Sequence, residues 1–370
     1  SFVNPHDIVL FPAWQRRSPI APSPLDPPHV PPAPTATEDL SGKPAAQIAF
    51  REAYYTGYGP AAFIERAYTR GAQRYRDLYY RLHAEVDGPI DRVRRAVTEG
   101  GSTDAVLVRT ADHGELLGAH GGLHQKWFNL YDEATRVPLV IARIGPRATE
   151  PRTVEAPTSH VDLVPTLLAA AGIDEAATAE RLAETFSEVH PLPGRNLMPV
   201  VDGGPADPDR PVYLMTRDNV LEGDTGASGL ARRLGRAHRP PAPLRIRVPA
   251  HVASNFEGLV VRVDEERARG GAGHLWKLVR TFDDPATWTE PGVRHLAADG
   301  PFGAAYRTEP VDDQWELYDL TADPVEAVNR WTDPALHELR AHLRDLLKQV
   351  RAASVPERHN PWPYVARRGR

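Results

Sequence analysis

The sequence contains no cysteine, and this absence excludes several kinds of site. A chain without thiols has no disulfide, no zinc–thiolate centre and no cysteine nucleophile. The sequence also lacks an apolar run of about 18 uncharged residues, which a membrane-spanning helix needs, and it does not open with the basic and then apolar segment of a secretory leader. These absences predict no membrane span and no signal peptide, and they favour a cytoplasmic location.

An excess of positive charge is also missing, because 44 basic residues face 49 acidic ones and the formal net charge is −5. This balance argues against a nucleic-acid groove. Hydrophobic residues make up 41% and charged residues 25% of the 370 residues, which is typical of a globular protein and excludes wholesale disorder and a coiled coil. The length favours one larger and one smaller domain.

The first part of the chain changes from an irregular to a helical pattern. It opens at Ser1 in a short strand-like run, so we expect a fragment that begins inside a fold. Prolines crowd between Pro12 and Pro44 and predict a long surface loop, because proline is excluded from central strands and helix interiors. From Ala45 to Glu99 apolar residues recur at helical spacing, which predicts one long helix or two.

Strand and helix patterns alternate in the middle of the chain. Residues 104–110 and 137–144 have the apolar runs of buried strands, and a helix is predicted over 159–172. The alternation predicts an α/β domain with a largely parallel sheet over residues 1–200. Residues 201–370 predict a small α+β subdomain, whose strand and helix candidates are 211–215, 259–263, 275–281, 315–320 and 334–350.

Asp112, His113 and Gly114 follow directly after the strand predicted at 104–110. Open α/β folds collect their ligands at the carboxyl ends of strands, where a carboxylate and an imidazole can share one divalent cation. Gly114 would let the backbone turn so that both side chains face the same point. The triplet alone also fits an Asp that caps the next turn beside an ordinary loop histidine.

Three further residues, taken singly, leave their roles open. His120 and His124 have the spacing of a helical zinc pair, but two intervening glycines oppose a rigid helix. Lys126 fits an anion site or an exposed surface position equally well. His6 follows a strand-like run and is explained by a simple turn.

Taken together and in this order, the motifs resemble the sulfatase family of the alkaline-phosphatase superfamily. The resemblance covers almost the whole chain and is carried by the segments Phe2–His6, Thr110–Glu115, Gly122–Pro138, Ser159–Leu168, Gly194–Leu197 and Glu316–Leu320. It implies an alkaline-phosphatase-like, mostly parallel sheet flanked by helices, without its N-terminal strands, and a small C-terminal α+β subdomain.

The resemblance also implies a function, which is the hydrolysis of sulfuric esters at a divalent-metal site. It implies that Asp112 and His113 bind the metal, that Lys126 and His6 contact the sulfate group, and that His124 is a further contact. Calcium is the metal implied, since hard oxygen ligands dominate such sites, while an imidazole at His113 also admits manganese or zinc. The partner implied is a small sulfate ester, not a nucleic acid or a membrane.

The sequence departs from the family pattern in its nucleophile. The family carries a Cys-or-Ser-x-Pro-x-Arg segment, oxidised to formylglycine, and two Asp metal ligands before the Pro-His strand, and this chain starts at that strand. Ser354–Arg358 fits the pattern by chance after the last helix. Ala111 replaces the usual Ser, and the spacing from Lys126 to Arg136 is one residue longer than usual.

Three hypotheses therefore remain. The chain is the C-terminal portion of a sulfatase, or of a phosphodiester or phosphonate monoester hydrolase of the same superfamily, or it is a non-catalytic remnant that binds a partner or an anion. In each case the missing first strands predict exposed sheet edges and apolar faces.

Overall fold

The structure is a computed structural model that describes residues 5–6, 8, 11, 21–57, 61–101, 104–186, 189–216, 252–263, 273–300 and 303–355. The strand-like run at 1–4, the start of the proline-rich stretch at 12–20 and most of the Ser354–Arg358 segment lie outside these residues. None of the helices within the described ranges is long and apolar enough to cross a membrane.

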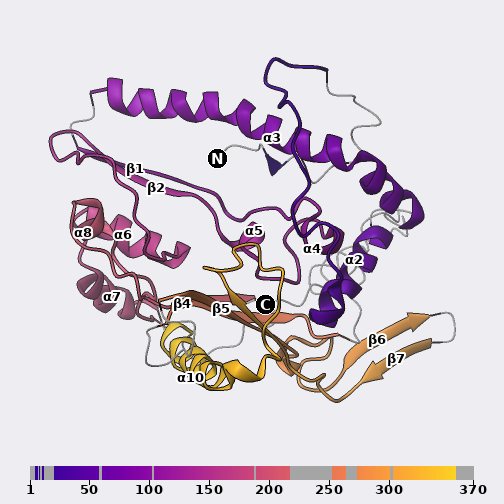
Figure 1. The fold of residues 1–370 in the computed structure, drawn as a ribbon. Coiled ribbons are helices and arrows are strands. Elements are labelled where there is room, and N and C mark those ends of the chain that lie inside the picture. Colours follow the sequence, from indigo (N-terminus) through magenta and orange to yellow (C-terminus); the bar gives the residue numbers. More distant parts are fainter. Residues whose placement is uncertain are drawn as a thin grey trace, which may run out of the picture.

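The N-terminal part is helical where the apolar periodicity predicts helices. It forms α2 (Ala45–Gly57) and the long α3 (Ala61–Glu99), which lies along the top of Figure 1. One face of α3 is buried. It is formed by residues at helical spacing, which are Tyr68, Tyr75, Leu78, Leu82 and Val86. The irregular segment 21–44, which contains only the 3-10 turn η2 (Leu40–Gly42), is fixed to α3 by Arg76 and Arg81 through the carbonyls of Val30 and Ala21.

The two predicted strands of the middle region form β1 (Ala105–Thr110) and β2 (Leu139–Ile144). They pair antiparallel, with Ala105 opposite Ile144 and Thr110 opposite Leu139, so these two strands do not supply parallel pairing to the largely parallel sheet predicted for residues 1–200. A parallel pair needs a crossover connection, usually a helix. The connection between β1 and β2 contains only the four-residue helices α4 (Ala119–Gly122) and α5 (Asp132–Thr135), and no crossover helix. The chain therefore returns beside β1 in the opposite direction.

A small helical group follows β2. It comprises η3 (His160–Asp162), α6 (Leu163–Ala170), α7 (Glu175–Ala183) and α8 (Met198–Val201). The fully buried Asp162 anchors it, because both carboxylate oxygens accept hydrogen bonds from Arg210 at 2.6 Å. Several large apolar side chains of this group face solvent, among them Val164, Leu167 and Phe186.

The C-terminal layer is a four-stranded antiparallel sheet in the order β3 (Val212–Thr216), β4 (Asn255–Arg262), β5 (Leu275–Phe282) and β8 (Gln314–Asp319). The hairpin β6 (His295–Gly300) and β7 (Gly303–Arg307) extends from it, and the short turns η5 (Pro285–Thr287) and η6 (Pro334–Leu336) complete the layer. The four strands sit where the sequence predicts short strands.

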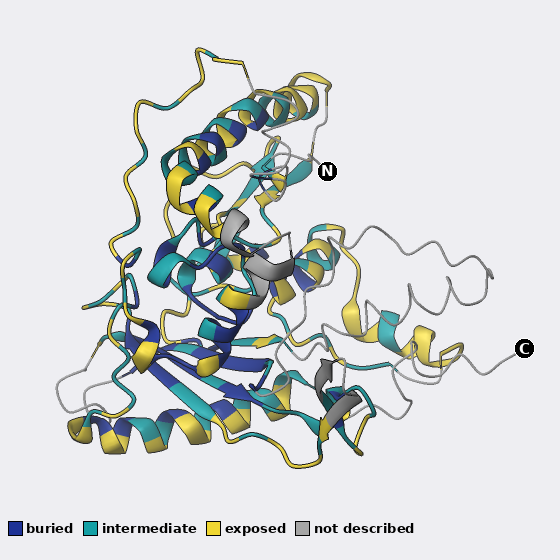
Figure 2. Cartoon of the chain, turned by 90° about the vertical axis from the view of Figure 1, so that its right-hand side faces the viewer, coloured by how far each residue is buried: buried dark blue, intermediate teal, exposed yellow. Residues whose placement is uncertain are grey.

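Both faces of this sheet are covered. On one face α10 (His337–Ser354) packs its buried leucines against Leu259, Leu278 and Leu317. On the other face Val279 and Tyr318 belong to a core shared with α2, α3 and the connection between β1 and β2. Figure 2 shows the result as a band of buried strands between half-exposed helices. The chain is therefore a mixed α/β protein with helices flanking its sheets, as the sequence predicts.

Candidate active site

Asp112 and His113 lie next to each other where the chain leaves β1. The Nε2 atom of His113 is 3.4 Å from the Oδ2 atom of Asp112, and the side chains are 37% and 84% exposed. The Nδ1 atom of His113 lies 2.9 Å from the carbonyl oxygen of Gly114. Because a carbonyl oxygen only accepts, Nδ1–H donates to it, and this contact orients the ring with Nε2 towards the carboxylate.

Gly114 allows this turn because its backbone packs tightly against α5. Its N–H donates to the carbonyl of Ala134 at 2.9 Å. A Cβ atom at this position would lie 2.0 Å from the carbonyl oxygen of Glu133, so only glycine fits. The structure thus gives the steric reason for the glycine that follows the predicted ligand pair.

The pair fits the divalent metal that the family resemblance implies. A carboxylate oxygen and an imidazole nitrogen lie 3.4 Å apart, close enough to share one cation, and the second ring nitrogen is held by a backbone carbonyl, as is usual for histidine ligands. Within the described ranges no group of three or more histidine, aspartate and glutamate side chains is placed to hold a metal ion. The described residues therefore provide two ligands, and their roles stay predictions.

The charge of Lys126 acts on Glu115, and the charges of Glu115 and Asp112 act on Tyr79. Burial raises the pKa of Glu115, and the nearby charge of Lys126 works against this rise. Burial, then the charges of Glu115 and Asp112 among others, raises the pKa of Tyr79 on α3 to about 12. Sequence reasoning missed Glu115 and Tyr79, because a Glu after a metal-ligand motif and a Tyr on an apolar helix face carry no signal of their own.

Glu115 closes the loop between the predicted metal ligands and Lys126. Its Oε1 atom accepts hydrogen bonds from the N–H of Gln125 at 2.5 Å and from the hydroxyl of Tyr75 at 3.0 Å. The backbone there is strained, because three of the five described non-glycine residues with positive φ, Leu117, His120 and Gln125, lie in this loop, and a fourth, Phe128, follows it. Such strain persists only where surrounding contacts enforce it.

His124 is buried, whereas His6 is exposed. The ring of His124 is buried against Tyr68, with 4.0 Å between centroids, and near Tyr75. Burial lowers the pKa of His124 to about 3, so the ring is neutral and part of an aromatic core. His6 is exposed in the turn after Pro5. No hydrogen bond or ion pair among the described residues joins it to Asp112, His113 or Lys126, and its sulfate contact stays a prediction.

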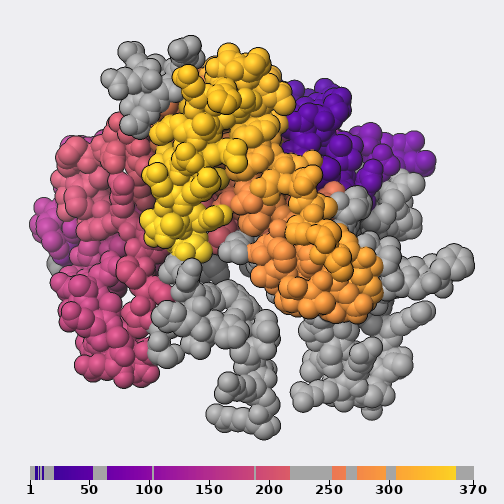
Figure 3. Space-filling model, turned by 90° about the horizontal axis from the view of Figure 1, so that it is seen from below, coloured from indigo at the N-terminus to yellow at the C-terminus, as the bar shows by residue number. Residues whose placement is uncertain are grey.

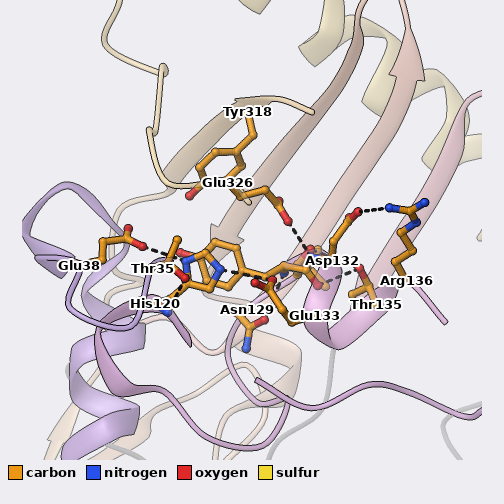
Figure 4. Close-up of polar contacts among 12 residues, drawn as sticks. Thr35, Glu38, His120, Asn129, Asp132, Glu133, Thr135, Arg136, Tyr318 and Glu326 are labelled. Carbon is orange, nitrogen blue, oxygen red and sulfur yellow. Dashed lines mark hydrogen bonds and ion pairs between the residues drawn. The ribbon is translucent and has the colours of Figure 1, made fainter. Parts of the chain in front are cut away.

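His120 is the centre of a buried ionic network behind the loop (Figure 4). Its Nδ1 atom lies 2.9 Å from Oε2 of Glu38, its Nε2 atom lies 3.3 Å from Oε2 of Glu133, and its ring stacks on Tyr131 at 3.5 Å. Burial would lower the pKa of His120, but the bonds to Glu133 and Glu38 outweigh it and raise that pKa. A zinc pair of His120 and His124 is not formed, because the two rings lie in different surroundings.

The network continues to the C-terminal sheet through two buried lysines. The Nζ atom of Lys43 lies 2.9 Å from Glu38 and donates to the hydroxyl of Tyr318 at 2.9 Å. The Nζ atom of Lys277 lies 2.6 Å from Asp132 and 2.8 Å from Glu326. These pairs tie the site loop and α5 to β5, to β8 and to the turn after β8.

Comparison with known proteins agrees with this fold. Residues 22–173 match the family model Sulfatase. The uncharacterized sulfatase YidJ of Escherichia coli (strain K12) is 32% identical over 165 residues, which are 45% of this chain and 28% of YidJ. The multifunctional alkaline phosphatase superfamily protein PehA of Trinickia caryophylli is 28% identical over 185 residues, which are 48% of this chain and 33% of PehA.

Solved structures give the same fold. A putative sulfatase from Bacteroides thetaiotaomicron superposes with a TM-score of 0.54 and 18% identity, covering 95% of this chain and 57% of that protein. The fold is therefore alkaline-phosphatase-like, with sheets flanked by helices. Residues 22–173 are similar to the sulfatase family, which is the resemblance that the motifs of the sequence indicate. The match spans a third or less of the curated relatives described above.

Proposed function

We propose that this chain carries the cation- and sulfate-binding part of a sulfuric-ester hydrolase. The observation that supports this most is the Asp112–His113 pair, which lies at the carboxyl end of β1 with the imidazole nitrogen 3.4 Å from the carboxylate. The pair falls inside the stretch that matches the sulfatase family. It is exposed to solvent and therefore open to a ligand, unlike the ionic network behind it.

In this proposal each residue has a separate task. Asp112 and His113 hold the divalent cation, which when bound polarises the oxygens of the sulfate group. Lys126 balances negative charge on the sulfate, because a cation fixed in place before the reaction stabilises developing charge better than water does. His6 is a further sulfate contact and His124 a packing residue. The closure of the loop by Glu115 keeps Lys126 in place relative to Asp112.

The family's nucleophile is formylglycine, and no segment of the 370 residues matches its motif at the family's position. We therefore expect the isolated chain to bind aryl sulfates without turning them over. A long incubation of the purified chain with 4-nitrophenyl sulfate and Ca²⁺ measures this directly. Turnover that survives both Asp112→Ala and Lys126→Ala would show that the site lies elsewhere.

Binding provides the positive test. Calorimetry should show that Ca²⁺, Mn²⁺ or Zn²⁺ strengthens the binding of 4-nitrophenyl sulfate to the chain. Asp112→Ala should remove the metal effect, and Lys126→Ala should weaken sulfate binding with and without metal. Asp345→Ala, which removes an exposed carboxylate on α10, is the control and should change neither. Equal binding in all four proteins would contradict the proposal.

A second function of the same superfamily is the hydrolysis of phosphodiesters or phosphonate monoesters. The imidazole of His113 favours it, since an N donor shifts preference from calcium towards manganese or zinc. The similarity to PehA, described as a multifunctional superfamily protein, is in keeping with it. Competition between phenyl phosphonate and phenyl sulfate for the metal-loaded chain separates the two, since the preferred ester displaces the other at lower concentration.

A further inference from the structure

A hydrogen bond from another part of the chain reaches β1 two residues before Asp112. The Nε2 atom of His160 lies 3.1 Å from the hydroxyl oxygen of Thr110. Thr110 is the last residue of β1 and His160 is the first residue of η3. The Cα atoms of Thr110 and Asp112 are at most about 7 Å apart, because two residues of extended chain span no more than that. The contact therefore joins the helical group after β2 to the strand end from which the predicted metal ligands leave.

The turn that carries His160 is fixed by the buried carboxylate of Asp162. This carboxylate accepts hydrogen bonds from the N–H of Ser159 at 2.9 Å and from the N–H of Arg195 at 2.7 Å. It also accepts the two bonds from Arg210, which lies just before β3 of the C-terminal sheet. Figure 3 shows the helical group in pink beside α10 in yellow. The backbone of His160 thus has a fixed position relative to the C-terminal sheet.

The side chain of His160 takes no part in this anchoring. It is exposed, and among the described residues its ring makes no hydrogen bond or ion pair other than the one to Thr110. Thr110 is also exposed and lies at the end of a two-stranded sheet, where Leu139 of β2 is its partner. A two-stranded sheet has little stability of its own, so a contact from a fixed turn adds order to this strand end.

We propose that His160 is a positioning residue of the candidate active site, which acts through Thr110 to fix the direction of the segment that carries the predicted metal ligands. The inference rests on the proposed function, because it concerns the same Asp112–His113 pair. The contact of Gly114 with α5 holds the far end of this short segment, and His160 holds its start. Ligands that are ordered before the cation arrives bind it more tightly, since binding does not then have to order them.

Calorimetric titration of the full chain with Mn²⁺ is the first measurement. His160→Ala and Thr110→Val should each weaken Mn²⁺ binding at least threefold and leave the midpoint of urea unfolding unchanged, because both side chains are exposed. The double substitution should weaken binding no more than either change alone, since both remove the same contact. Thr110→Ser keeps the hydroxyl and should restore the affinity of the parent. His337→Ala, which removes an exposed histidine of α10, is the matched control and should bind as the parent does.

Hydrogen–deuterium exchange of residues 110–114, measured without metal, separates this inference from the proposed function. The N–H of His113 donates to the carboxylate of Asp112 at 3.0 Å, so its exchange reports on the order of the segment. His160→Ala and Thr110→Val should speed exchange of the segment at least threefold, and Thr110→Ser should not.

Unchanged exchange overturns the role of His160. So does unchanged Mn²⁺ affinity in His160→Ala when Asp112→Asn weakens binding, and that result leaves the proposed function intact. A parent chain that binds no Mn²⁺, Ca²⁺ or Zn²⁺ overturns the proposed function, and with it the role of His160 in metal binding.

Discussion

The two ends of the loop after β1 use the same kinds of side chain in opposite ways. At one end, Asp112 and His113 form an exposed pair with few other partners. At the other end, His120 is fully buried, lies between Glu38 and Glu133, and stacks on Tyr131. The two ends of the loop therefore differ in what they can do. The exposed side chains of Asp112 and His113 are accessible to a ligand, whereas the buried ionic contacts of His120 hold the strained loop in place.

The buried ionic network is where a single substitution should cost most. Lys277→Met leaves the carboxylates of Asp132 and Glu326 facing each other in the interior without their cation. Breaking a buried pair on one side typically costs about 3–5 kcal/mol, so we expect a loss of that size in the free energy of urea unfolding. Lys348→Met at the surface should cost under about 0.5 kcal/mol. Equal losses in the two variants would contradict the role given to the network.

The buried His124 should make the protein acid-sensitive. Its pKa is lowered to about 3 by burial, below the ordinary value of 6.5, so its contribution to stability is present above pH 6.5 and is lost as the pH falls towards 3. Each pH unit in this window costs about 1.4 kcal/mol. His124→Phe keeps a ring against Tyr68 without a proton-binding group, and its stability should fall less between pH 6 and pH 4. Parallel curves for both proteins would contradict the assignment.

The contribution of His120 to the stability of the fold should depend on pH in the opposite sense to that of His124. Its raised pKa in the folded state means that its contribution is fully present below pH 6.5 and is lost as the pH rises through the folded value. His120→Gln leaves Glu133 without its partner and should cost about 1–3 kcal/mol at pH 6. The difference from the wild type, followed by urea unfolding, should shrink by pH 9. A difference that grows with pH would mean that the ring is neutral when buried.

The sequence predicts those structural features that depend on residues close together along the chain, and it does not predict contacts between distant segments. The helical periodicity of 45–99 and the strand before Asp112 are local patterns, and they appear where expected. Asp112 and His113 lie side by side after β1, and their role as metal ligands stays a prediction. The antiparallel pairing of β1 and β2 was missed, because it depends on the path of the connection and not on either strand. The link from Glu38 through His120 to Glu133 joins segments 82 and 13 residues apart, and no spacing rule reveals such a contact.

The burial of His124 is a second feature that the sequence does not reveal, and its sulfate contact stays a prediction. A histidine two residues before Lys126 invites a shared role with that lysine. The positive φ of Gln125, which lies between them, turns the chain so that His124 enters the aromatic core while Lys126 stays half-exposed. Neighbouring positions in a strained loop therefore need not share an environment, and the exposed end of the loop is the part to test for binding.

Asp112→Asn gives the smallest expected effect on stability and so the sharpest contrast with Lys277→Met. The side chain is 84% exposed, and an exposed substitution of nearly equal size should change the free energy of unfolding by no more than about 0.5 kcal/mol. The same substitution removes the charged oxygen beside Nε2 of His113, so titration with Mn²⁺ or Ca²⁺ should show at least a tenfold loss of affinity. Asp91→Asn, at an exposed carboxylate on α3 that pairs with Arg94 and Arg95, should leave metal affinity unchanged. If Asp112→Asn instead destabilises the fold and leaves metal affinity intact, the exposed pair is structural and the separation between the two ends of the loop is lost.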